Sequence, residues 1–335
     1  MSSKLKPLAE QVIVITGASS GIGLVTARTA ARAGARVLMI ARSEDVLRGL
    51  VTELQGEGLR VEAKAADVGD AAAVEAAAAY AVEVFGRIDT WVNDAGSAIF
   101  GKVLDTPIDE QERLFQTNYF GVVNGCVAAV PRLKAGGALI TVGSLASDMP
   151  APPMGIYSAT KHAVKAYVEV LRMELQADGV PISVTLVKPS GIDTPIGQHA
   201  QNHASDKEAQ IPPPVYDPQL VADAILDCAV HPRREVTVGG GGRAQVLFSQ
   251  HFPALYEWLA PRVAKAAYSP TKEQPRPSNL DRGVGAGRER SGEHPHALKT
   301  SIYTAAVLHP KTTMLGFGGL ALAAGLIWAR REKAA

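Results

Sequence analysis

The sequence predicts an α/β protein built on a doubly wound parallel sheet of about seven strands, with helices on both faces. Three observations point to this fold. Short runs that are apolar throughout alternate with longer segments of helical composition from residue 11 to about residue 240. Those runs do not alternate apolar with polar residues, which indicates strands buried on both faces. A glycine-rich turn joins the first run to the first helical segment.

The expected strands are short runs rich in apolar residues, mainly Val, Ile, Leu and Ala, and a helical segment follows each strand except the last. The expected strands are 12–15, 37–40, 61–65, 88–92, 138–142, 182–187 and 236–238. The expected helices are 22–33, 43–55, 70–85, 109–130, 157–177 and 217–230. Ser43 and Asp70 stand where N-caps are expected, and Pro218 stands in a first turn, where its missing N–H is harmless.

Composition divides the chain into four parts. Residues 1–242 hold the dense apolar segments and form the expected catalytic domain. Residues 243–268 form a helical extension, which Pro253 and Pro261 are expected to break into short helices. Residues 269–300 are rich in Pro, Gly, Arg, Glu and Ser, a composition typical of a flexible linker. The remaining part, 301–335, is a hydrophobic C-terminal segment.

Residues 312–329 carry no charge over eighteen positions, the lower limit for a helix across about 30 Å of hydrocarbon. Two interpretations stay open. A tail anchor, which we favour, would attach a cytoplasmic catalytic domain to a membrane, with Trp328 at one border. A docking or interfacial helix explains the four glycines better. A full span would also export Arg330 and Arg331, against the positive-inside tendency.

Charge and cysteine content exclude several classes of function. The 34 basic and 33 acidic residues balance to a net charge of +1, which does not predict a nucleic-acid partner. Cys126 and Cys228 lie far apart without CxxC spacing, which indicates neither a disulfide framework nor a zinc site and fits a reducing cytoplasm. His199 and His203 are interpreted as solvated loop residues, so we expect no metal.

The turn after the first strand contains Gly17, Gly21 and Gly23. Glycines let a backbone turn sharply and approach a pyrophosphate, and the N-terminus of the following helix favours an anion. Ligands of doubly wound folds bind where the parallel strands end. The turn therefore predicts a dinucleotide site at the carboxyl edge of the sheet.

Tyr157 and Lys161 are four residues apart, so both side chains lie on one face of their expected helix. An ammonium near a phenol favours the phenolate. We therefore expect the pKa of Tyr157 to be lowered from its usual ~10, toward a range suited to proton exchange.

Several motifs together resemble the short-chain dehydrogenase/reductase superfamily over residues 10 to about 240. They are the turn TGASSGIG at 16–23, the segment NDAG at 93–96, Ser144, and YSATK at 157–161. The resemblance implies a Rossmann-like fold and a homo-oligomer. It also implies an oxidoreductase that moves a hydride between a nicotinamide dinucleotide and a carbonyl or alcohol carbon.

The resemblance further implies a catalytic set of Asn118, Ser144, Tyr157 and Lys161. In this set Ser144 holds the substrate oxygen, Tyr157 exchanges the proton, Lys161 also holds the nicotinamide ribose, and Asn118 supports a water-linked relay. Ser147 competes locally with Ser144 but has the poorer spacing to Tyr157. Asn118 falls in the middle of an expected helix, so packing in a helix irregularity is its alternative role.

Cofactor preference depends on the residues that follow the second strand. Ala41 and Arg42 supply no carboxylate for ribose hydroxyls, whereas the Arg42 guanidinium can pair with a 2′-phosphate. NADP is therefore favoured, with NAD as the alternative. The predicted cofactor-binding residues are Gly17, Ser19, Ser20, Gly21, Ile22, Gly23, Arg42, Asp67, Val68, Asn93, Ala95, Gly96, Tyr157, Lys161, Pro189, Gly191, Ile192 and Thr194.

Two positions depart from the family pattern. Asp94 replaces the second of two usual asparagines, which puts in doubt a side-chain bond that stabilises the central strand. Ser190 separates Pro189 from Gly191 in the motif expected to meet the nicotinamide carboxamide. The aperiodic segment 195–214 that follows is expected to be a mobile lid over the substrate.

The leading hypothesis is an NADP-dependent carbonyl reductase or alcohol dehydrogenase that acts on a small-molecule carbonyl or alcohol. A reductase of 3-oxoacyl or other lipid-type ketones is the nearest alternative. The alternative of another class is a dinucleotide-binding regulator without turnover, which would gain nothing from a tuned phenol beside Ser144.

Overall fold

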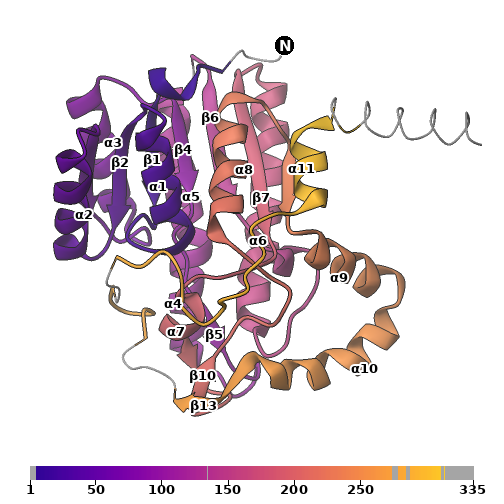
Figure 1. Ribbon diagram of the computed structural model, residues 1–335. Coiled ribbons are helices and arrows are strands. Elements are labelled where there is room, and N and C mark those ends of the chain that lie inside the picture. The colour runs from indigo at the N-terminus through magenta and orange to yellow at the C-terminus, as the bar shows by residue number, and fades with distance from the viewer. Residues whose placement is uncertain (1–4, 134, 274–277, 284–286, 311–312, 314–335) are drawn as a thin grey trace, which may run out of the picture.

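The structure is a computed structural model, and it describes residues 5–133, 135–273, 278–283, 287–310 and 313. Its central sheet has seven strands, all parallel, in the order β12-β7-β6-β4-β1-β2-β3. The predicted doubly wound sheet is thus confirmed (Figure 1). The strands are β1 Val12–Thr16, β2 Arg36–Ala41, β3 Val61–Ala65, β4 Thr90–Asn93, β6 Gly137–Val142, β7 Ile182–Pro189 and β12 Glu235–Val238.

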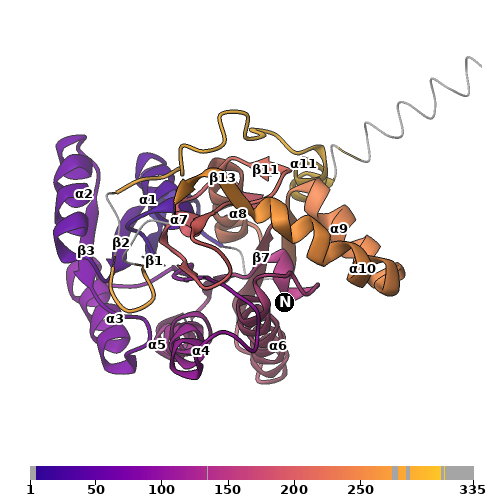
Figure 2. The same cartoon turned by 90° about the horizontal axis from the view of Figure 1, so that it is seen from below.

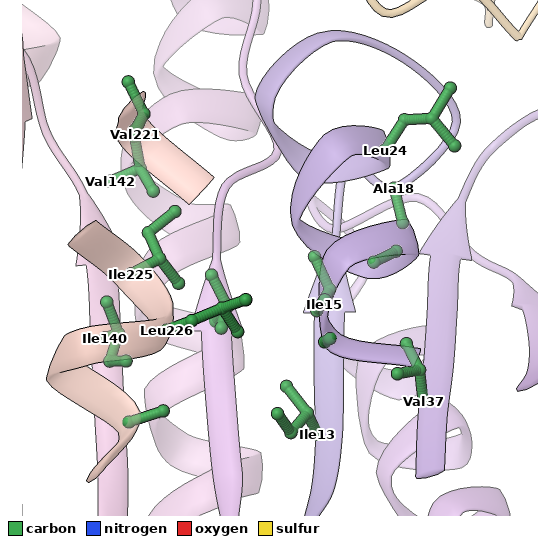
Figure 3. Packing of buried hydrophobic residues seen from close by; sticks show 14 of the residues in the cluster. Ile13, Ile15, Ala18, Leu24, Val37, Ile140, Val142, Val221, Ile225 and Leu226 are labelled. Atoms are coloured by element: carbon green, nitrogen blue, oxygen red, sulfur yellow. The ribbon is translucent and has the colours of Figure 1, made fainter. Parts of the chain in front are cut away.

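Helices cover both faces of this sheet, as the fully apolar strands predict. One face packs against α1 Gly21–Arg32, α2 Glu44–Gly56 and α8 Pro218–Val230. The other packs against α3 Ala71–Phe85, α5 Gly121–Leu133 and α6 Gly155–Ala177. Ile13 and Ile15 of β1 point to the first layer and Val14 to the second, since successive strand residues face opposite sides. Figure 3 shows the first layer, with side chains of α1 and α8 against the strands.

The helix starts follow the expected capping chemistry in part. The Asp70 carboxylate accepts from the N–H groups of Ala72 and Ala73, and Asp217 accepts from that of Gln219. Pro218 follows at the first position of α8. Ser43 occupies the N-cap of α2, but its side chain makes no capping bond.

The helix expected at 109–130 is interrupted. It consists of α4 Ile108–Phe115, a π-helix at Gln116–Phe120, and α5. Asn118 lies in the π-helix and is fully buried. The prediction of one regular helix was wrong because the π-helix aims the Asn118 amide at Ser97 and Thr160.

The helical extension follows the expectation in part, because it is broken at Pro253 but not at Pro261. Helix α9 starts at Gly240 and ends at His251. Pro253 begins α10 Pro253–Val263, where it is harmless, and Pro261 lies within the last turn of α10 without ending it there. Strand β13 Tyr268–Glu273, which lies mostly in the predicted linker, pairs with β10 Lys207–Ala209 and so holds part of the segment expected to be a lid.

Beyond β13 the chain returns along the sheet domain to α11 Ile302–Leu308, as Figures 1 and 2 show in orange to yellow. The described parts of the predicted linker are bonded to that domain. The Leu298 N–H donates to the Val215 carbonyl at 2.8 Å, and the Asp217 N–H donates to the Leu298 carbonyl at 3.0 Å. Two short β-strand pairs, β8 Gly191–Ile192 with β11 Val215–Tyr216 and β5 Ile99–Phe100 with β9 Gln201–Asn202, complete this edge.

The predicted anchor at 312–329 lies, apart from Thr313, outside the described residues. Among the residues that are described, no helix has the length and apolar character needed to cross a bilayer.

Candidate active site

A cleft runs along the carboxyl edge of the sheet, with about 170 Å³ of open space. It lies where the strand order reverses between β1 and β4, the usual ligand position in this architecture. Its walls come from the loops after β1, β2, β3, β4, β6 and β7, together with one later segment. The lining residues are Gly17, Ser19, Ser20, Gly21, Ile22, Ala41, Arg42, Ser43, Ala66, Asp67, Val68, Asp94, Ala95, Gly96, Thr117, Val142, Gly143, Tyr157, Lys161, Thr194, Pro195, Ile196, His199, Asn279 and Gly283.

The glycine turn is packed so closely that side chains are excluded. Gly17 has a φ of +72°, and a Cβ there would lie 2.8 Å from the Cα of Ala95. A Cβ on Gly23 would lie 2.5 Å from the Gly17 carbonyl oxygen. Ser20, the N-cap of α1, makes no side-chain capping bond; at the start of this helix the Gly21 N–H donates to the Arg288 carbonyl at 2.9 Å and the Gly23 N–H donates to Asp94.

The reactive side chains gather at one end of the cleft. Ser144 follows β6 and hydrogen-bonds Tyr157, which lies in the first turn of α6. The Lys161 ammonium donates to the Val142 carbonyl at 3.1 Å and lies 5.6 Å from the centre of the Tyr157 ring. The structure therefore brings the predicted serine, tyrosine and lysine together.

Burial governs the pKa values at this end. Enclosure by protein raises the pKa of Tyr157 to about 12, and the bond with Ser144 only partly opposes the rise. The pKa of Lys161 is lowered to about 8 by the same enclosure. The expected lowering of the Tyr157 pKa was wrong in direction, because desolvation of the phenol dominates. The Lys161 ammonium is engaged by the Val142 carbonyl.

Asn118 lies behind these groups rather than on the cleft wall. Its amide nitrogen donates to the Ser97 carbonyl at 3.0 Å and to the Thr160 hydroxyl at 3.1 Å, while its oxygen accepts from the Ser97 N–H at 2.9 Å. A Cβ built on Gly96 would lie 3.4 Å from that oxygen and 3.9 Å from the Lys161 nitrogen. Asn118 therefore holds the loop after β4 beside Lys161.

The two residues of the Asn93–Asp94 pair have separate roles. The Asn93 oxygen accepts from the Trp91 indole at 2.7 Å, and its nitrogen lies 3.5 Å from the Thr141 hydroxyl on β6. The bond to the central sheet thus belongs to Asn93 and survives the departure at 94. Asp94 accepts from the Gly23 N–H, and burial raises its pKa to about 7 against the opposing effect of Lys161.

The other end of the cleft holds Arg42 and Asp67. Arg42 follows β2, as predicted, and its guanidinium donates to the carbonyls of Leu280 and Asn279 at 3.2 and 2.5 Å. Asp67 accepts from the Gly69 N–H at 2.9 Å and lies 3.4 Å from Arg113. A guanidinium and a carboxylate thus both stand at this end.

Several predicted site residues lie outside the cleft wall. Gly23 and Asn93 pack behind it, Pro189, Gly191 and Ile192 belong to β7 and β8, and Ser144 lies next to the lining residue Gly143. Ser147 has a fully buried hydroxyl and is not on the wall. Sequence reasoning missed Asn279 and Gly283, which come from the predicted linker and carry no motif.

Comparison with known proteins decides the family. The family model described as short chain dehydrogenase matches residues 11–205. The chain belongs to the short-chain dehydrogenase family. As a member it is an oxidoreductase. One relative of this short-chain dehydrogenase is the uncharacterized oxidoreductase YxnA of Bacillus subtilis (strain 168), 38% identical over 98% of this chain and 93% of its own length. Another is dehydrogenase/reductase SDR family member 7B of Xenopus tropicalis, 31% identical over 70% of this chain and 78% of its own.

Solved structures resemble this short-chain dehydrogenase across the sheet domain and beyond. An alcohol dehydrogenase of Thermococcus sibiricus, complexed with 5-hydroxy-NADP, has a TM-score of 0.60, with 28% identity over 68% of this chain and 95% of its own. A short-chain dehydrogenase/reductase of Burkholderia phymatum, in complex with NAD, has a TM-score of 0.63, with 25% identity over 82% of this chain and 99% of its own.

Proposed function

We propose that this protein is an NADP-dependent carbonyl reductase or alcohol dehydrogenase that acts on a small-molecule substrate. The observation that carries the proposal is the joining of Ser144, Tyr157 and Lys161 at one end of a cleft whose other end holds Arg42. The relatives whose structures hold NADP-type or NAD cofactors support a nicotinamide dinucleotide.

The residues present fit such a cofactor. The glycine turn packs directly against Ala95, where a Cβ at Gly17 would collide, and it also lines the cleft that a pyrophosphate would occupy. Once released from the Arg288 carbonyl, the Gly21 N–H at the α1 N-terminus would donate to a phosphate. Lys161 would hold the nicotinamide ribose, and the Arg42 fork would pair with the 2′-phosphate. Asp67, Val68 and Thr194, which were also predicted for the cofactor, line the same cleft.

When bound, the dinucleotide supplies or accepts the hydride, and the protein manages the proton. In the reducing direction negative charge grows on the carbonyl oxygen, and the hydroxyls of Ser144 and Tyr157 would both donate to it. With a pKa of about 12, the Tyr157 phenol is protonated at neutral pH, so it holds the proton that the forming alkoxide would take. The ammonium of Lys161 would then stabilise the phenolate, and Asn118 would keep the loop after β4 in position.

The test is a substrate panel followed at the reduced-nicotinamide absorbance. Aldehydes, ketones and 3-oxoacyl thioesters are offered with NADPH and with NADH, and Tyr157→Phe is compared with the natural chain. We expect Tyr157→Phe to lose about 10²–10⁴-fold in turnover while it still binds the dinucleotide. Turnover unchanged by the substitution would refute the mechanism. A chain that binds dinucleotide but reduces nothing on the panel would favour the regulator.

A further inference from the structure

A segment far along the chain closes over the proposed dinucleotide cleft. We call residues 278–283 and 287–291 the strap. Figures 1 and 2 show this part of the chain passing the carboxyl edge of the sheet between β13 and α11. Asn279 and Gly283 lie in the cleft wall.

The strap occupies the groups that the dinucleotide needs. Both bonds that the Arg42 guanidinium makes to the strap end on main-chain oxygens, those of Asn279 and Leu280. At the glycine turn, the Gly21 N–H donates to the Arg288 carbonyl at 2.9 Å. An amide at the start of α1 and a guanidinium after β2 are the donors expected for a pyrophosphate and a 2′-phosphate.

The first part of the strap is anchored by one apolar side chain. Leu280 is 2% exposed and packs with Ile99, Leu114, Ile156 and the ring of Tyr157. The neighbouring Asn279 donates its N–H to the His199 carbonyl at 2.8 Å and accepts from the Ser97 hydroxyl at 2.6 Å.

The second part is anchored by charge. Arg290 forms a two-bond pair with Asp217 at 2.9 and 3.0 Å, Glu289 pairs with Arg28 at 2.7 Å, and Ser291 donates to Asp193. With both parts in place the cleft keeps about 170 Å³, below the roughly 300–1,000 Å³ of small-molecule sites.

We propose that the strap competes with the dinucleotide, and that residues 278–283 must leave Arg42 before a 2′-phosphate can bind there. This inference rests on the proposed function. A phosphate replaces two neutral carbonyl acceptors by a charge-assisted pair, so NADP can displace the strap at Arg42. NAD has no 2′-phosphate, so it offers the Arg42 guanidinium no acceptor in place of these two carbonyls. The strap therefore lowers the affinity for NADP, because its displacement from Arg42 is part of binding the 2′-phosphate.

The first test releases the strap by substitution in the full chain. Leu280→Ser removes its apolar anchor, and Leu298→Ser is the matched control because Leu298 is 46% exposed and lies beyond the strap. Dissociation constants are measured for NADPH, NADH, 2′,5′-ADP and 5′-AMP. We expect Leu280→Ser to tighten NADPH and 2′,5′-ADP by about tenfold, since a competitor that must be displaced lowers apparent affinity. Unchanged or weaker NADPH binding in Leu280→Ser would overturn the proposal.

The second test uses the natural chain and hydrogen exchange. NADPH should accelerate exchange at the Asn279 amide, which is bonded to His199, and leave the Leu298 amide, bonded to Val215, unchanged. Slower exchange at the Asn279 amide would show that the strap stays in place and lines the occupied site. That result would overturn the proposal. Dinucleotide binding without any change at Asn279 would also overturn it and leave the proposed function standing. If neither the natural chain nor Leu280→Ser binds any dinucleotide, both this proposal and the proposed function are overturned.

Discussion

At one end of the cleft, Tyr157 and Lys161 are held by bonds to Ser144 and Val142, within the sheet and the helix that packs on it. At the other end, Arg42 is held by main-chain oxygens 237 and 238 residues further along the chain. The first set of bonds joins groups of the core to one another. The second set consists of acceptors that a phosphate can replace.

This difference suggests a division of roles: proton transfer depends on one part of the fold, and access of the cofactor to the cleft depends on another. The core fixes the proton-transferring groups, whereas a late segment decides whether the cofactor can enter. Substitutions at the two ends should therefore change different measured quantities.

The largest effect is expected at the core end. Lys161→Met removes the cation that would stabilise the Tyr157 phenolate, and we expect turnover to fall about 10²–10³-fold. Steady-state kinetics with NADPH and the best carbonyl substrate provide the measurement. Lys102→Met is the control, because the Lys102 side chain is 83% exposed. A loss confined to KM would show that Lys161 acts on binding alone.

A smaller and selective effect is expected at Arg42. Arg42→Met removes the proposed partner of the 2′-phosphate, so the affinity for NADPH should fall about 10- to 100-fold while that for NADH stays nearly constant. Titration calorimetry with both cofactors measures this difference. Arg48→Met, on α2 and 68% exposed in its side chain, is the matched control. An equal loss for both cofactors would remove the argument for NADP preference.

Asp94 lies in the cleft wall near Lys161, and we expect a substitution there to change the stability of the protein. Its pKa is about 7 in the folded protein against an ordinary 3.8, so the folded state holds the extra proton between these values. Stability should therefore fall as pH rises from 4 to 7 and stay low above 7. Asp94→Asn removes this loss.

We expect the Asp94→Asn gain at pH 8 to be about 1–2 kcal/mol, less than the full shift implies, because Asp94 is only partly buried. Urea unfolding at pH 5 and pH 8 compares the two chains. A gain equal at both pH values would assign the effect to packing instead.

The smallest effect is expected where the strap meets the core. Ser97→Ala removes the 2.6 Å bond to the Asn279 side chain, which is worth about 1 kcal/mol for a neutral pair. Because the bond holds the strap closed, the dissociation constant for NADPH should fall by up to about fivefold, as fluorescence titration would detect. Weaker NADPH binding in this variant would show instead that Ser97 contributes to binding the cofactor.

The sheet and the proton-transferring groups could be predicted from the sequence because both depend on local patterns. Strand β1 is apolar from Val12 to Ile15 because both its faces are covered, and Tyr157 and Lys161 meet because they are four residues apart on a helix. The π-helix around Asn118 could not be predicted, since it depends on bonds to Ser97 and Thr160 from other elements. The direction of the Tyr157 pKa was mispredicted because burial is a tertiary property.

The strap could not be predicted for a different reason. Its contacts with Arg42 and Gly21 use main-chain carbonyls, which every residue has, so no residue type marks them. Leu280 is its one large buried apolar side chain among the described residues, and a single leucine has no periodicity. A composition rich in Pro, Gly and charged residues indicates that a segment has no hydrophobic core of its own. Such a segment can still be bound in place on the surface of another domain.

Both cysteines lie within helices packed on the sheet: Cys126 in α5 is 1% exposed and Cys228 in α8 is 0% exposed. Burial raises the pKa of each thiol to about 12, so neither forms the thiolate that alkylating dyes attack. A maleimide fluorophore would therefore label a cysteine introduced by Arg282→Cys, at an exposed position, without background from the native thiols. The molecule thus offers a ready means of watching that stretch of backbone move in real time.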